Sequence, residues 1–230
     1  MTVDKGIDIL AYAHQAGNVL DCVPEKVKRA TEELEARMAT LDLLPAPHGP
    51  ILDLGCAGGW ALCELERRHP EHEVVGVTLF EEEAIPAREV SGCPVIVADM
   101  HALPPDWTGR FGTVYMSHAL EHSPAPLVAL CEAQRVLHDG GWLFVVMPDA
   151  QGYTRMTTDH PNRLDTFPGH VFCASIDTTI HLLRKAGLHF QRYHEIVQEY
   201  EGRLQYSHRI FVAQKDASRR NPWTRRKTEA

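Results

Sequence analysis

A glycine-rich run from Ile51 to Gly59 contains the residue types that point most directly to chemistry. It reads Ile-Leu-Asp-Leu-Gly-Cys-Ala-Gly-Gly, an apolar segment that enters a turn. Glycine has no Cβ, so the backbone there can bend sharply and lie against a ligand. A helix expected over 60–68 would direct its free N–H groups and partial positive charge toward that ligand. The run predicts a site for a nucleotide-like cofactor, and a tight strand-to-helix turn that binds nothing is the alternative.

The next apolar segment ends at Thr78 and Leu79, about twenty residues further along the chain. In open α/β sheets the second strand usually ends on an acidic residue that binds ribose hydroxyls. Thr78 stands at that position, and its hydroxyl can bind a ribose more weakly than a carboxylate would. Glu81 or Glu82 could supply the missing carboxylate.

A third apolar segment ends at Ala98-Asp99-Met100, again about twenty residues later. A carboxylate at this position can accept a hydrogen bond from an adenine amino group. Ligands of open α/β sheets lie at the carboxyl ends of the strands, so Asp99 is expected near the glycine-rich run.

Histidine is abundant, with 14 residues, and two of them frame the sequence His118-Ala-Leu-Glu121-His122. This is the H-x-x-E-H pattern of a class of zinc proteases. On a helix the two histidines would share a face and could bind zinc. A zinc hydrolase is therefore one hypothesis, and a loop shaped by hydrogen bonds of Glu121 and His122 is the structural alternative.

Together these motifs resemble the class I S-adenosylmethionine-dependent methyltransferases, especially the type 11 group that includes ubiquinone and menaquinone biosynthesis methyltransferases. The resemblance covers roughly residues 48–150 and, more weakly, His170 to Lys215. It rests on four segments in order: Asp53 to Gly59, Ala98 to Pro104, Phe111 to His122 and Arg135 to Leu143. Three positions depart from the family pattern: Ala57 replaces a glycine, Thr78 an acid and Thr113 an aspartate.

The resemblance implies a Rossmann-like α/β fold. Its sheet is expected to have seven strands, mostly parallel, with helices on both faces and an antiparallel last strand. S-adenosylmethionine is the implied cofactor, and no metal is implied. The residues expected to bind the cofactor are Asp53, Gly55, Cys56, Ala57, Gly58, Thr78, Leu79, Asp99, Met100, Ser117 and His118.

The sulfonium of such a cofactor already carries an activated methyl group. The protein must align the acceptor with it, and it needs a base only if the acceptor holds a proton to be removed. Residues near the carboxyl ends of the strands are the candidates, because ligands bind there. They are His118, Asp149 and His170, and a simple loop hydrogen bond is the alternative for each.

The remaining pattern places these residues on alternating strands and helices. Helices are expected over 7–20, 24–44, 60–68, 81–90, 126–137 and 177–186. Strands are expected over 51–54, 73–79, 94–98, 113–116, 142–147, 188–198 and 208–214. Asp139-Gly140-Gly141 is expected to end the helix before it. These elements divide the chain into a helical cap (1–47), a cofactor-binding domain (48–214) with an acceptor-side insert (149–175), and a basic tail (215–230) expected to be disordered.

Charge and composition limit the classes of partner that the protein can have. The net charge is −8, and the last 16 residues carry six Lys or Arg against two acids, so the rest of the chain is at −12. This acidic body favours a small-molecule acceptor and disfavours nucleic acid, which requires basic surface. The six cysteines have no Cys-x-x-Cys spacing, and no long apolar run or signal sequence is evident, so we expect a cytoplasmic protein without a membrane span.

Three hypotheses follow. The first is a methyltransferase acting on a small molecule. The second is a repurposed or non-catalytic cofactor-binding protein, suggested by Ala57, Thr78 and Thr113. The third is the zinc hydrolase. A nicotinamide dehydrogenase is disfavoured because the turn lacks G-x-G-x-x-G spacing, and the sequence leaves the oligomeric state open.

Overall fold

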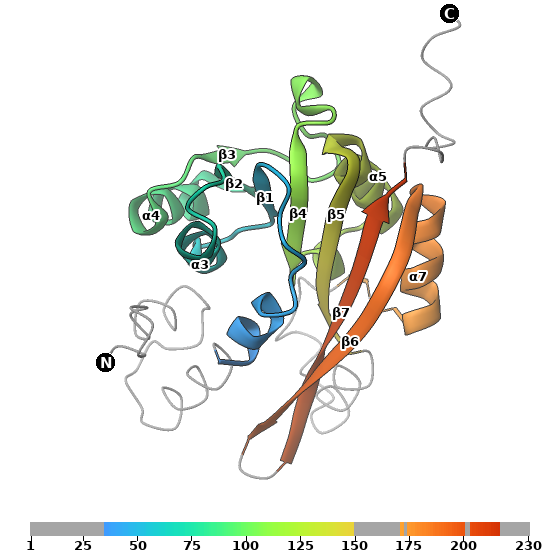
Figure 1. Cartoon of the computed structure of the whole chain (residues 1–230). Helices are drawn as coiled ribbons and strands as arrows, with labels where there is room; N and C mark the ends of the chain where they lie inside the picture. The colour runs from blue at the N-terminus through green and yellow to red at the C-terminus, as the bar shows by residue number, and fades with distance from the viewer. Residues whose placement is uncertain (1–34, 150–170, 173, 201–202, 217–230) are drawn as a thin grey trace, which may run out of the picture.

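The computed structural model describes residues 35–149, 171–172, 174–200 and 203–216. Seven strands form one sheet in the order β3-β2-β1-β4-β5-β7-β6 (Figure 1). The strands are β1 (Ile51–Leu54), β2 (Val74–Thr78), β3 (Val95–Val97), β4 (Phe111–Ser117), β5 (Leu137–Pro148), β6 (Leu188–Tyr200) and β7 (Arg203–Lys215). The helices are α3 (Trp60–Arg68), α4 (Glu81–Ser91), α5 (Pro126–Val136) and α7 (Ile176–Lys185), with short 3-10 turns η1 (Pro105–Trp107) and η2 (Leu120–His122).

The strand directions confirm the expected Rossmann-like architecture. β1 pairs in parallel with β2 and β4, and β3 and β5 extend this parallel set on either side. β7 is antiparallel to both β5 and β6. The predicted seven-stranded, mostly parallel sheet with an antiparallel last strand is therefore confirmed.

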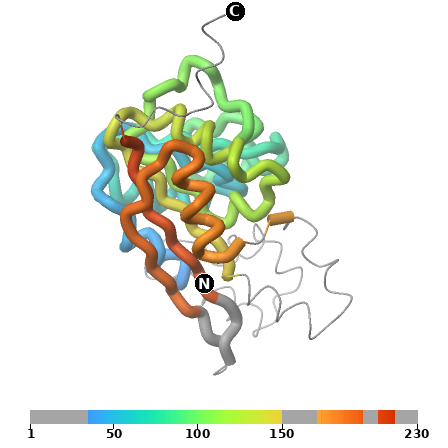
Figure 2. The backbone as a smooth tube through the Cα atoms, turned by 90° about the vertical axis from the view of Figure 1, so that its right-hand side faces the viewer, coloured from blue at the N-terminus to red at the C-terminus, as the bar shows by residue number. Residues whose placement is uncertain are grey.

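Two apolar layers cover the sheet, one on each face. Successive strand residues point to opposite faces, so Ile51 packs with α3 and α4 while Leu52 packs with α5 and α7. All four residues of β1 are buried, as expected for a central strand of a sheet covered on both sides. Figure 2 shows α7 lying along the hairpin formed by β6 and β7.

The segment before β1 is helical over 35–41, so the helix predicted over 24–44 ends at residue 41 rather than 44. Met38 and Leu41 of this helix are buried in the same layer as α3 and α4. Residues 24–34 and the predicted helix over 7–20 lie outside the described residues, and so does nearly all of the insert. The division into cap, domain and tail stays a prediction.

The junction between α5 and β5 differs from the prediction. Asp139-Gly140-Gly141 does not end the helix; α5 ends at Val136 and β5 begins at Leu137. Leu137 already has extended dihedral angles, and the pairing with β4 shifts register between Phe111 and Thr113. Gly140, with φ of 83°, lies inside this irregular start of the strand. The apolar pattern over 142–147 could not indicate such a bulge.

The hairpin of β6 and β7 is longer than predicted. The ladder between β5 and β7 ends at Pro148 and His208, while β7 continues to pair with β6 back to Arg203. In Figure 1 the hairpin extends beyond the end of β5. No helix in the described ranges has the length and apolar composition needed to cross a membrane.

Candidate active site

A cleft of about 650 Å³ opens at the carboxyl ends of β1, β2, β3 and β4. This is the edge at which open α/β sheets bind ligands. The predicted cofactor residues that line it are Gly55, Ala57, Thr78, Leu79, Asp99, Met100 and His118. Of the other predicted residues, Asp53 and Cys56 are buried, Gly58 lies in the turn, and Ser117 is half-buried at the end of β4.

The glycine turn is held close to the sheet. The amides of Gly55 and Cys56 both donate to the carbonyl of Val77, at 2.9 Å each. Gly55 has φ of 91°, and a Cβ on it would lie 2.5 Å from the Cβ of Ala119. Only glycine fits there, which leaves bare backbone facing the cleft. Ala57 has φ of 43°, so the residue that replaces a family glycine still adopts the left-handed conformation.

An acidic side chain, that of Asp53, is buried in β1 just before this turn. Asp53 ends up inside the sheet, and burial raises its pKa to about 8. Its Oδ2 has no hydrogen-bond partner among the residues that the structure describes, although buried polar atoms in proteins are nearly always paired. The bare backbone at Gly55 lets a ligand such as the amino-acid part of S-adenosylmethionine approach the turn. Asp53 does not line the cleft, and with a pKa of about 8 its side chain is mostly protonated at neutral pH.

The carboxylate next to the end of β2 belongs to Glu83. The hydroxyl of Thr78 donates to Glu83, and both side chains line the cleft. Glu81 instead pairs with Arg88 at 2.6 Å, and Glu82 is exposed. The sequence shows three glutamates in the first turn of α4. It does not show how the helix is rotated about its axis, and this rotation decides which glutamate faces the cleft.

The end of β3 is held by a histidine that the sequence did not single out. The backbone amide and ring Nδ1 of His101 lie 2.9 and 2.5 Å from Oδ1 of Asp99. Ring Nε2 of His101 lies 2.6 Å from Oγ of Ser123. The hydrogen bond from the His101 amide is the largest influence that lowers the pKa of Asp99, so this carboxylate is ionised at neutral pH.

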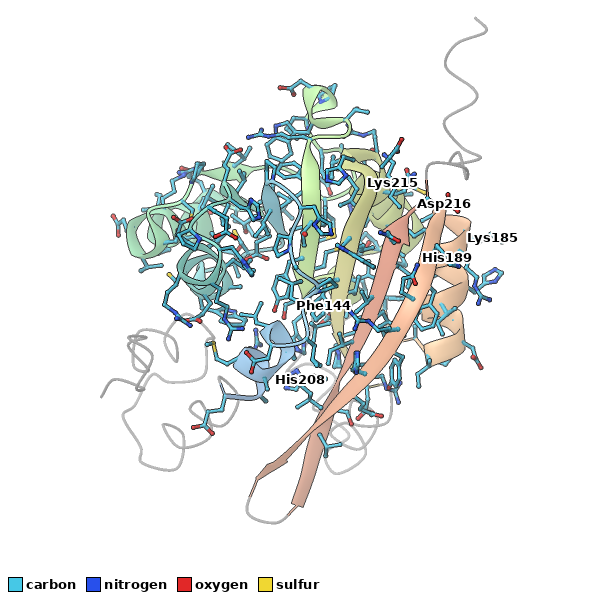
Figure 3. All side chains as sticks on the ribbon, viewed as in Figure 1. Phe144, Lys185, His189, His208, Lys215 and Asp216 are labelled. Carbon is cyan, nitrogen blue, oxygen red and sulfur yellow. The ribbon has the colours of Figure 1, made fainter. Side chains whose placement is uncertain are left out.

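His118 lines the cleft and has φ of 51°, a left-handed conformation that is uncommon outside glycine. Its Nδ1 donates to the buried Glu121 at 3.2 Å. Its Nε2 lies 2.9 Å from Nδ1 of His208, 90 residues away in the sequence. Figure 3 shows His208 midway along β7, beside the helix over 35–41. Both ring nitrogens of His118 are thus engaged.

The geometry of this segment does not support the zinc hypothesis. His118 precedes the single 3-10 turn η2, so it does not share a helix face with His122. Its Nδ1 binds Glu121 rather than facing a metal position. Within the described part of the chain, no group of three His, Cys, Asp or Glu residues could hold a metal ion.

Asp149 and His170, the other two candidate bases, lie in different parts of the chain. Asp149 is buried, and its Oδ2 accepts from the amide of Ser207 at 3.0 Å, which ties the end of β5 to β7. His170 lies outside the described residues. Its neighbour Val171 lines the cleft, and the Val171 amide donates to the carbonyl of Glu121 at 2.9 Å.

The strand order, the glycine turn after β1 and the acid after β3 define the class of S-adenosylmethionine-dependent methyltransferase folds. Residues 52–145 match the family described as Methyltransferase domain. This part of the chain is therefore similar to methyltransferase domains, and S-adenosylmethionine is the cofactor that this similarity implies.

Two curated proteins are similar over part of their length. An uncharacterised 37.1 kDa protein of transposon TN4556 from Streptomyces fradiae is 34% identical over 128 residues, 53% of this chain and 36% of that protein. Malonyl-[acyl-carrier protein] O-methyltransferase from Legionella pneumophila is 30% identical over 124 residues, 52% of this chain and 43% of that protein. The matches cover less than half the length of both relatives.

Solved structures share the fold at low identity. An S-adenosylmethionine dependent methyltransferase from Mesorhizobium loti superimposes with a TM-score of 0.63 at 19% identity, over 80% of this chain and 99% of that one. The [4+2]-cyclase SpnF superimposes with a TM-score of 0.62 at 17% identity, over 82% of each chain. Because a cyclase has the same fold, the fold alone does not establish methyl transfer.

Proposed function

We propose that this protein transfers the methyl group of S-adenosylmethionine to a small-molecule acceptor bound beside His118. The observation that carries the proposal is the cleft at the carboxyl edge of a methyltransferase domain. It brings together the Gly55 turn, the Thr78–Glu83 pair and the Asp99 carboxylate. S-adenosylmethionine has three polar parts: an amino-acid arm, a ribose and an adenine. The Gly55 turn, the Thr78–Glu83 pair and Asp99 offer a polar partner to each of these parts in that order.

Each part of the cofactor is assigned to a strand end. The turn at Gly55 and Ala57, above the buried Asp53, receives the amino-acid arm. Thr78 and Glu83 bind the ribose hydroxyls, and the carboxylate supplies the charge that Thr78 lacks. Asp99 accepts from the adenine amino group, and the apolar side chains of Leu79 and Met100 pack against the ring. The predicted contacts of Cys56, Gly58 and Ser117 remain part of the proposal.

The acceptor is assigned to the side of His118, next to Val171 and the insert. When bound, S-adenosylmethionine supplies an activated methyl group. The chain must then orient the acceptor and exclude water. Because both ring nitrogens of His118 are engaged, it can take a proton only if the contact with His208 opens. Asp149 and His170 stay the other candidate bases.

The acidic body supports a small molecule over a nucleic acid, as the sequence predicts. A cytoplasmic location stays a prediction. The second candidate, a repurposed cofactor-binding protein, is supported by the shared fold of the cyclase SpnF.

A labelled-methyl assay tests the proposal. Purified full-length protein is incubated with methyl-labelled S-adenosylmethionine and separated fractions of a cell extract: small molecules, proteins and nucleic acids. We expect label in a small-molecule product, lost in Asp99→Ala and retained in Asp106→Ala, which removes an exposed carboxylate from η1. Cofactor binding without transfer to any fraction would favour the repurposed protein instead.

A further inference from the structure

His101 joins two loops that both line the cofactor cleft. Asp99 follows β3 and Ser123 follows η2, and the His101 ring contacts both side chains, at 2.5 and 2.6 Å. These contacts belong to this chain's own Asp99-Met100-His101 sequence, and neither the motif pattern nor the methyltransferase match assigns them a role.

The chemistry of the partners fixes the direction of the hydrogen bonds. An ionised carboxylate only accepts, so Nδ1 carries the proton of the neutral His101 ring. Nε2 is then an acceptor, and the Ser123 hydroxyl donates to it. Oγ of Ser123 in turn accepts from the amide of Ala125, at 3.2 Å. The hydrogen bonds therefore run in one direction, from the start of α5 to the Asp99 carboxylate.

The arrangement uses one oxygen of Asp99 and leaves the other for a ligand. Both the backbone amide and the ring of His101 donate to Oδ1. The Asp99 side chain is 54% exposed, so without His101 it would sample several orientations. With Oδ1 held at two points, Oδ2 has a fixed position and keeps its capacity to accept.

We propose that His101 is a positioning residue that fixes the Asp99 carboxylate and makes the cleft select a 6-amino purine over a 6-oxo purine. The inference rests on the proposed function, because it requires adenine beside Asp99. An amino group donates to Oδ2, whereas a 6-oxo group opposes one acceptor with another. The 6-oxo purine does carry a donor on its ring nitrogen, but only a carboxylate that can rotate would reach it. A fixed carboxylate therefore discriminates between the 6-amino and the 6-oxo purine, and a mobile carboxylate discriminates less between them.

Calorimetric titration of the full chain with two compounds measures this selectivity. The compounds are S-adenosylhomocysteine and its 6-oxo analogue, S-inosylhomocysteine, and the readout is the ratio of their Kd values. We expect the wild type to prefer the adenine compound by about thirtyfold or more. His101→Ala should reduce that ratio by about tenfold, and Ser123→Ala by about threefold.

Two further variants separate positioning from a merely structural role. His101→Asn retains a side-chain donor for Asp99 and should keep most of the preference. His181→Ala removes an exposed histidine from α7 and should leave the ratio unchanged. Thermal unfolding of each variant confirms that it is folded before it is titrated.

An unchanged ratio in His101→Ala, or equal weakening of both compounds, would overturn the inference and leave the proposed function standing. A wild-type protein that binds neither compound would overturn the proposed function, and the role of His101 with it. A ratio that collapses in His101→Ala and recovers in His101→Asn supports the inference.

Discussion

The two sides of the cleft are built in different ways. On the side proposed for the cofactor the polar groups lie at or just after the ends of β1, β2 and β3, and their contacts are local: Thr78 bonds to Glu83 five residues on, and Asp99 to His101 two residues on. On the other side His118 bonds to His208, 90 residues away, and only the sheet brings them together. Short motifs can therefore specify the first side, whereas the second requires the whole fold.

The largest expected effect is the loss of cofactor affinity when a side chain is added at Gly55 in the glycine turn. Gly55→Val would place a side chain 2.5 Å from the Cβ of Ala119 on a backbone with φ of 91°. We expect affinity for S-adenosylhomocysteine to fall by more than about a hundredfold in calorimetry. Gly109→Val is the matched control, since Gly109 has φ of 70° but no atom of the described residues within 4 Å of a Cβ. Equal loss in both variants would mean that backbone strain, not the local turn, controls binding.

On the side of the cleft where His118 contacts His208, the expected effect is on the pH dependence of the unfolding free energy. Burial, then the charges of His118 and Arg37, lower the pKa of His208 to about 2. The unfolded chain takes up this proton below about pH 6.5 and the folded chain does not, so His208 removes stability as the pH falls through that value. In His208→Phe the loss of unfolding free energy between pH 6.5 and 5 should be smaller by about 2 kcal/mol.

Denaturant titrations at several pH values measure this difference, with the exposed His181→Phe as control. His208→Phe should also leave the Kd of S-adenosylhomocysteine within about twofold of wild type. A large change in cofactor affinity would show that the two sides of the cleft are not independent.

The ribose contact should have an intermediate effect. Glu83→Gln removes the charge beside Thr78 and should weaken S-adenosylhomocysteine by about tenfold. Glu82→Gln removes the same charge from an exposed position in the same helical turn and should have no effect. Calorimetric titration of both variants with S-adenosylhomocysteine measures the difference. Equal loss of affinity in both variants would indicate only a long-range effect of charge.

The smallest expected effect concerns Ala57. Its φ of 43° carries the cost of a left-handed conformation for a residue with a Cβ. Ala57→Gly relieves that strain but makes the unfolded chain more flexible, so we expect a net stabilisation of about 0.5 kcal/mol. Thermal unfolding measures it, and a lower Tm would show that Ala57 makes packing contacts worth more than the strain.

The same contrast explains what the sequence could predict. The short apolar runs that each end in a turn predict that Gly55, Thr78 and Asp99 lie at one edge of the sheet, and all three line the cleft. Glu83 was missed because the sequence does not set the rotation of α4. His208 was missed because nothing near it in the chain signals a contact with His118. The start of β5 was misplaced because a glycine pair can end a helix or form a bulge.

Calorimetric titration of the full chain with S-adenosylhomocysteine tests the central claim most directly. We expect one site per chain with a Kd on the order of 10 µM, and loss of the heat signal in Gly55→Val but not in Gly109→Val. The absence of any heat with either S-adenosylhomocysteine or S-adenosylmethionine at millimolar concentration would contradict it.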